Sequence, residues 1–158
     1  MHVIAAKAIC FREAMTPKFR VYSRQIVRNS RELARSLAKF DFRIVSGGTD
    51  THLLLVDLTE KRITGADASR ILEQAGITVN KNLIPFDRKS PAVTSGIRIG
   101  TQAVTTRGMK EFHMRKIAQL INKAVESSDN QKKLGEIKRE VSDLTNSFPL
   151  YQELLREK

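Results

Sequence analysis

Cysteine is nearly absent from this chain, and long apolar runs are missing altogether. Its 158 residues include one cysteine, Cys10, so no internal disulfide can form, and a single thiol fits a reducing cytoplasm. No apolar stretch approaches the roughly 20 residues that span a membrane as a helix. The N-terminus lacks the charged-then-apolar layout of a signal peptide. These absences argue against a disulfide-stapled or membrane-spanning class, and we expect a cytoplasmic protein.

Metal ligands are also sparse. His2 and His113 do not belong to a recognised pattern with cysteines or carboxylates, so we predict no metal site. The chain has no internal repeat and no low-complexity tract. Its 41% hydrophobic content, with 8 glycines and 4 prolines, is typical of one globular unit with its own core.

Positive charge is the main excess, with a net charge of +11 that is concentrated near the start of the chain. Residues 1–43 carry ten Lys and Arg against three Asp and Glu, whereas residues 44–105 carry seven against six. A basic helix can bind nucleic acid or an anionic membrane surface, but this arginine face has no interleaved aromatic side chains for base stacking. We therefore favour a solvated helix face with weak, non-specific affinity for polyanions.

Two helices are expected at the N-terminus. Residues 2–15 are small and apolar and begin without a cap, so we interpret them as a chain that enters mid-structure. Thr16-Pro17 marks the start of the second helix, because proline is tolerated in a first turn. The apolar residues of this helix fall on one face: Phe19, Tyr22, Ile26, Leu33 and Leu37. Its arginines fall on roughly the opposite face: Arg20, Arg24, Arg28, Arg31 and Arg35.

From residue 41 the pattern alternates between strands and helices. Strands are expected at 42–45, 51–57, 77–79 and 93–99. Helices are expected at 64–75, with Thr64 as N-cap and Gly76 as stop, at 109–126, with Phe112 on its buried stripe, and at 131–147. The 51–57 strand is apolar on both faces, which is typical of a central strand. The sequence predicts an α+β sandwich, an antiparallel sheet covered by helices, with residues 1–40 as a helical segment and 41–158 as the α+β domain.

Arg98 stands in an apolar, strand-like run between Gly96 and Gly100. We expect its guanidinium to be partly buried, and a buried charge needs a partner. Two interpretations stay open: the guanidinium holds a small carboxylate in the space above the glycines, or it pairs with an Asp or Glu of its own fold. Other residues are expected to be structural: Thr94 and Ser95 in local hydrogen bonds, His52 as a satisfied core histidine, and Cys10 as a small buried residue.

Four stretches resemble the C-terminal part of serine hydroxymethyltransferase: His2–Ala8, Val45–Asp57, Val79–Asp87 and Thr94–Thr101. The resemblance runs in order from residue 2 to about residue 125. It implies the C-terminal small domain of a fold-type I pyridoxal-phosphate enzyme, preceded by a long connecting helix. The complete enzyme interconverts serine plus tetrahydrofolate and glycine plus 5,10-methylenetetrahydrofolate in one-carbon metabolism.

The resemblance also implies two binding residues. Arg98 matches the arginine that holds the substrate α-carboxylate, and Asn82 lies in the loop that contacts the folate. From the residues alone, Asn82 is more simply a turn former. The chain departs from the family at Thr51, Leu54 and Gln102, where asparagine, an aromatic residue and proline are common, and we expect none of the three to touch Arg98.

The cofactor lysine of the family is absent from this chain, which has no Thr-Thr-Thr-His run before a lysine. Lys7 and Lys81 are only adventitious amines, because the other pyridoxal-phosphate contacts are missing too. We expect no catalytic residue here and no activity from this chain alone. It would supply Arg98 and part of the folate pocket alongside a missing N-terminal domain or a homo-oligomer partner. The alternative is a dead remnant that serves as a basic RNA- or protein-binding module.

Overall fold

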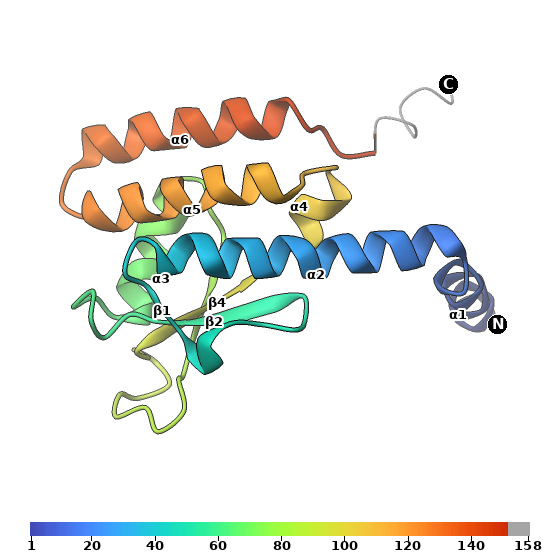
Figure 1. Ribbon diagram of the computed structural model, residues 1–158, viewed down its shortest axis with the longest axis horizontal. Coiled ribbons are helices and arrows are strands. Elements are labelled where there is room, and N and C mark those ends of the chain that lie inside the picture. The colour runs from blue at the N-terminus through green and yellow to red at the C-terminus, as the bar shows by residue number, and fades with distance from the viewer. Residues whose placement is uncertain (152–158) are drawn as a thin grey trace.

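Helices and one antiparallel sheet form separate layers in the computed structural model, which describes residues 1–151. Helices α2, α5 and α6 run side by side above the sheet, and α1 crosses the far end of α2 (Figure 1). The helices are α1 (His2–Ala14), α2 (Pro17–Ala38), α3 (Gly65–Gln74), α4 (Gln102–Thr106), α5 (Glu111–Glu126) and α6 (Gln131–Asn146). The strands are β1 (Arg43–Ile44), β2 (Leu53–Asp57), β3 (Asn80–Asn82) and β4 (Gly96–Gly100), and a short 3₁₀ turn, Val45–Gly47, follows β1. The predicted α+β class is confirmed.

The sheet has the order β1-β2-β4-β3, and every neighbouring pair is antiparallel. Strand β2 is therefore central, as its apolar sequence predicts. Leu54 lies opposite Ile99 and Val56 opposite Ile97, and all four side chains are buried. Because side chains alternate across a strand, Arg98 points to the other face of the sheet, which the helices leave open.

The hydrophobic core fills the space between the sheet and the helices. Leu33 and Leu37 of α2 and Leu120 and Ile121 of α5 are almost completely buried in it. Helix α6 covers α5 from the outside and buries Leu134. Fully burying each of these side chains stabilises the fold by about 1.5–3 kcal/mol relative to exposure.

The first two helices begin as the sequence predicts. Thr16 caps α2 by accepting a hydrogen bond from the backbone N–H of Phe19, and α1 has no side-chain cap and no buried residue. Phe19, although it belongs to the apolar face, is 42% exposed. The reason is that the first turns of α2 extend beyond the sheet and α5 (Figure 1), so burial on α2 begins only at Ile26.

Three residues that were expected to be buried are exposed instead. Cys10 is exposed because α1 packs no side chain into the core. His52 is exposed because it precedes β2 in the connecting loop, where only its backbone carbonyl is used, accepting from the N–H of Thr101. Phe112 is also wrong as a core residue, since it is 69% exposed while Met114 takes the buried position in the first turns of α5.

The strand boundaries differ from the prediction around α3. Helix α3 itself is confirmed, with the Thr64 hydroxyl accepting from the N–H of Asp67 and Gly76 at φ +79° after its last turn. Residues 77–79 are not a strand, because the ladder begins only at Asn80. Strand β4 begins at Gly96 rather than 93, because the carbonyls of residues 93 and 94 accept hydrogen bonds from the start of α3. The short helix α4 had no sequence signal that we identified.

Candidate functional site

Arg98 occupies the middle of β4 on the open face of the sheet. Its partners across the sheet are Leu55 on β2 and Asn80 on β3. The side chain is exposed, so the expected partial burial is wrong: the apolar neighbours Ile97 and Ile99 face the core on the opposite side of the strand. Among residues 1–151 no ion pair or hydrogen bond engages the guanidinium, so its charge is available to a ligand.

The two glycines beside Arg98 do not leave empty space, contrary to expectation. A Cβ on Gly96 would lie 2.7 Å from Cγ2 of Ile84, and a Cβ on Gly100 would lie 2.6 Å from Oε1 of Gln102. Neighbouring side chains therefore fold over both glycines. Gly96 is needed, because the backbone oxygens of Val56 and Asn82 would also lie 2.7 and 3.1 Å from its added Cβ, whereas the flexible Gln102 side chain could move away from a larger residue at position 100.

Two shallow hollows meet at Arg98. The first is lined by His52, Leu53, Thr78, Val79, Asn80, Arg98, Gly100 and Gln102. The second lies on the α3 side and is lined by Ala66, Ser69, Arg70, Glu73, Val79, Asn80, Lys81 and Arg98. The first combines a guanidinium with side-chain amides and contains no carboxylate, which suits a small anion.

Asn82 lies on the same face of the sheet as Arg98, although it ends strand β3 instead of standing in a loop. It pairs with Gly96, two residues before Arg98 on β4, and directly paired residues share a face. Its side-chain amide donates to the carbonyl of Leu83 at 2.7 Å, which leaves the amide oxygen as an acceptor. The structure thus places both expected binding residues on the open face, with Asn82 half-buried and Arg98 exposed.

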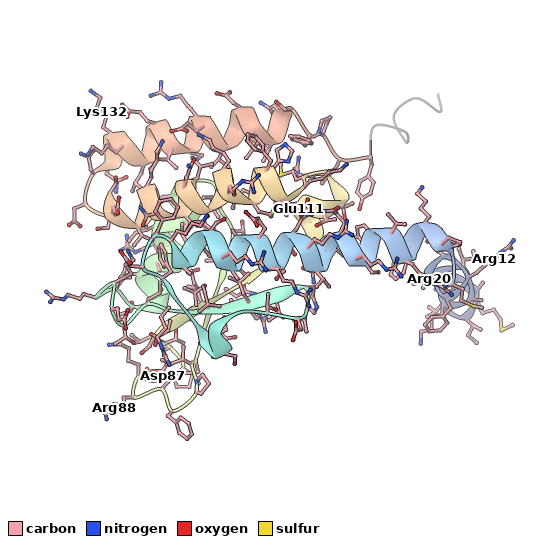
Figure 2. All side chains as sticks on the ribbon, viewed as in Figure 1. Arg12, Arg20, Asp87, Arg88, Glu111 and Lys132 are labelled. Carbon is pink, nitrogen blue, oxygen red and sulfur yellow. The ribbon has the colours of Figure 1, made fainter. Side chains whose placement is uncertain are left out.

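Asp87 organises the loop that follows β3, and the sequence analysis missed it. Its carboxylate accepts from the backbone N–H groups of Ile84, Lys89 and Ser95 and from the Ser95 hydroxyl, at 2.7 to 3.2 Å. Desolvation raises the pKa of Asp87, but these donors, with Lys89 and Ser95 foremost, outweigh it and lower the pKa to about 2. Figure 2 shows Asp87 and Arg88 in this loop, which extends away from the helices. The Asp-x-Lys spacing of an Asx-turn was the available signal.

Local hydrogen bonds hold the start of β4, as predicted. The Thr94 hydroxyl donates to the carbonyl of Gly96 at 3.1 Å, and Ser95 is bound to Asp87. Thr94 adopts φ +57°, a left-handed conformation that is uncommon for a threonine. The turn before β4 is therefore held in a defined shape rather than loosely connected.

A buried polar network fixes the other end of β4. Thr101 is fully buried, and its hydroxyl donates to the carbonyl of Ile26 on α2 at 3.0 Å. Asn29, also fully buried, donates to the Thr105 hydroxyl at 2.8 Å and to the carbonyl of Met109 at 2.9 Å. Sequence reasoning missed both residues, although an asparagine within the apolar stripe of a helix is a signal for such a network.

The basic face of α2 is only partly engaged. Arg31 pairs with Asp50 at 2.7 Å, both side chains being exposed. The backbone N–H of Glu111, at the start of α5, lowers the pKa of its own carboxyl group most. The Gln25 hydrogen bond and the charge of Arg28 lower this pKa further. Arg20, Arg24 and Arg35 are exposed, as expected for a solvated helix face. Surface ion pairs of this kind contribute about 0–1 kcal/mol.

Neither a metal site nor a membrane span is evident in the part of the chain that the structure describes. Within residues 1–151 no group of three or more histidine, cysteine, aspartate and glutamate residues is placed to hold a metal ion. No helix in the same residues is both long and apolar enough to cross a membrane.

Comparison with known proteins connects this chain to one family. A family model described as serine hydroxymethyltransferase matches residues 1–121. The chain is 50% identical over 156 residues to a serine hydroxymethyltransferase from Myxococcus xanthus (strain DK1622). That match covers 99% of this chain and 37% of the relative, so the chain spans little more than a third of the protein it matches. The chain belongs to the serine hydroxymethyltransferase family.

Proposed function

We propose that this chain supplies the carboxylate-binding arginine and part of the folate pocket of a serine hydroxymethyltransferase. The complete enzyme interconverts serine plus tetrahydrofolate and glycine plus 5,10-methylenetetrahydrofolate. In this proposal Arg98 binds the α-carboxylate of serine or glycine, and Asn82 contacts the folate. The observation that carries the proposal is the exposed guanidinium of Arg98, which has no partner among residues 1–151 and opens into a hollow without carboxylates.

Arg98 would act by binding and orienting the amino acid. A guanidinium presents two parallel N–H donors that match both oxygens of a carboxylate, which fixes the direction of the ligand as well as its charge. Strand β4 holds the arginine in place, since the turn at Thr94 anchors one end and Thr101 anchors the other. Asn82 offers its free amide oxygen to a donor on the folate, while one of its two N–H donors binds the carbonyl of Leu83.

The family's cofactor is pyridoxal phosphate, whose aldehyde carbon and electron-accepting ring supply the carbanion chemistry when it is bound. The residues of this chain alone do not form a binding site for pyridoxal phosphate. The first Arg98 hollow has no lysine amine, and Lys81 in the second hollow donates from its ammonium group to the carbonyl of Ala92 at 2.6 Å. We derive no catalytic step from this chain and propose that it is inactive alone.

Helix α1 supports the need for a partner. None of its residues is buried, and Val3, Ile4, Ile9 and Phe11 are all more than half exposed. A helix that is apolar around its circumference is typical of one enclosed by other protein. We propose that the remaining part of the enzyme, or a second subunit, covers α1.

A titration of the full chain tests the role of Arg98. Glycine added to ¹⁵N-labelled protein should shift amide signals of β4, with saturation, and Arg98→Ala should abolish these shifts. Arg139→Ala is the matched control, because Arg139 is an exposed arginine on α6 that lies outside both hollows. Shifts that persist in Arg98→Ala, or that never occur in the wild type, would refute the proposal.

Reconstitution tests the enzymatic assignment. Co-expression with the remaining portion of the Myxococcus relative should restore serine cleavage with tetrahydrofolate, whereas this chain alone should show none. Arg98→Ala in the complex should lower kcat/KM by at least about 100-fold, equivalent to about 2.7 kcal/mol of transition-state stabilisation.

The alternative function is a basic module that binds RNA or protein. The exposed arginines of α2 permit it, but a salt-sensitive affinity for any polyanion follows from the net charge of +11 alone. RNA binding that discriminates between sequences at 150 mM salt, together with no response to glycine, would favour this alternative.

A further inference from the structure

The side chain of Gln102 lies over Gly100, on the face of the sheet that carries Arg98. Its Oε1 atom would be only 2.6 Å from a Cβ placed on Gly100. Gly100 and Arg98 are two residues apart on one strand and therefore share a face. Arg98, Gly100 and Gln102 also line the same hollow. This departure from the family pattern therefore lies in the same hollow as Arg98.

The backbone that carries Gln102 is held in a defined place beside the hollow. Gly100 pairs with Leu53 at the end of the sheet. The next residue, Thr101, is fully buried, donates its N–H to the carbonyl of His52 at 3.0 Å, and binds α2 through its hydroxyl. Gln102 follows directly as the first residue of α4. The backbone that carries the amide is thus rigid, which limits the conformational entropy that is lost when the amide binds a ligand.

The chemistry of the hollow matches a carboxylate. Within residues 1–151 the amide of Gln102 makes no hydrogen bond, and the Arg98 guanidinium has no partner. Arginine only donates hydrogen bonds, and a glutamine amide can donate two. No acidic side chain lines this hollow to repel an anion.

We propose that Gln102 is a second carboxylate-binding residue, acting beside Arg98 on α-amino acids and other small carboxylic acids. This inference rests on the proposed function of Arg98. The guanidinium supplies the charge, and the Nε2 group of the Gln102 amide donates to a carboxylate oxygen. A residue larger than glycine at position 100 would push that amide aside. The proline that is common here in the family has no such donor, so this contact is a property of this chain.

Substitutions in the full chain test the proposal by NMR titration with glycine and, separately, with acetate. Gln102→Leu keeps the bulk of the side chain but removes the amide, and we expect about 10-fold weaker binding, equivalent to about 1.4 kcal/mol. Gln102→Glu should weaken binding further, because the introduced glutamate carboxylate would repel the carboxylate of the ligand. Gln119→Leu is the matched control, since Gln119 is exposed on α5 outside the hollow and should bind as the wild type does.

The outcomes separate this inference from the proposed function. If Arg98→Ala abolishes binding while Gln102→Leu and Gln102→Ala both retain wild-type affinity, the role of Gln102 is refuted and that of Arg98 stands. If the wild type binds neither glycine nor acetate, the proposed function itself fails. Gln102→Ala guards against a misfolded leucine variant, because alanine is well tolerated at an exposed helical position.

Discussion

Asn29→Ala should destabilise the chain more than its small change in volume suggests. Asn29 is fully buried and makes three hydrogen bonds: it accepts from Gln25 and donates to the Thr105 hydroxyl and the Met109 carbonyl. A typical hydrogen bond contributes about 0.5–1.5 kcal/mol, and leaving a buried partner unsatisfied costs about 1–3 kcal/mol. Met109 is itself almost completely buried, so water cannot easily replace the lost donor. We therefore expect a loss of about 3 kcal/mol.

Urea unfolding of the full chain, followed by circular dichroism, measures this loss. The midpoint should fall while the slope stays constant, since the surface exposed on unfolding barely changes. The melting temperature should fall by about 6–12 °C for a domain of this size. Asn146→Ala on the exposed face of α6 is the control and should change stability by less than about 0.5 kcal/mol. A loss below about 1 kcal/mol for Asn29→Ala would refute the network as a stabilising element.

Further predictions concern the Asp87 loop and the α3 contact. The pKa of Asp87, lowered from 3.8 to about 2, means that the loop is stabilised above pH 3.8 and loses this stabilisation as the pH falls through 2. A ¹³C titration of its carboxyl carbon should show this pKa, and Ser95→Ala should raise it; a wild-type value near 3.8 would contradict the hydrogen-bond assignment. Gly65→Ala should destabilise by more than about 2 kcal/mol in the same urea assay, because its Cβ would lie 2.0 Å from the Thr94 hydroxyl and 2.2 Å from the Gly96 carbonyl. An unchanged urea midpoint would show that the turn before β4 shifts to accommodate the added methyl group at little cost in stability.

The helices and the central strand could be predicted because their signals are local. Thr16 and Thr64 stand at caps, and the apolar run of β2 requires burial on a central strand. The boundaries of β3 and β4 could not be predicted, because they depend on contacts distant in sequence. The N–H groups of Gly65 and Ala66 bind carbonyls before β4 and remove those residues from the ladder.

The candidate site was also predictable only in part. Arg98 was identifiable from its glycine neighbours, and its position on the open face follows from simple alternation along β4. Its exposure does not follow from the apolar run around it, because in a strand the nearest neighbours in sequence point to the opposite face. The strand pattern does not indicate that Gln102 lines the same hollow, because this residue belongs to the following helix.

The absence of buried residues in α1 has a consequence for local stability. A 13-residue helix is marginal in water without tertiary contacts, whereas α2 beyond Ile26 is locked into the core. In the free chain, amide protons of residues 2–14 should exchange with solvent almost without protection, while those of residues 26–37 exchange only on global unfolding. A protease should first cut the chain between these two segments. Binding of a partner that covers α1 should slow amide exchange in residues 2–14.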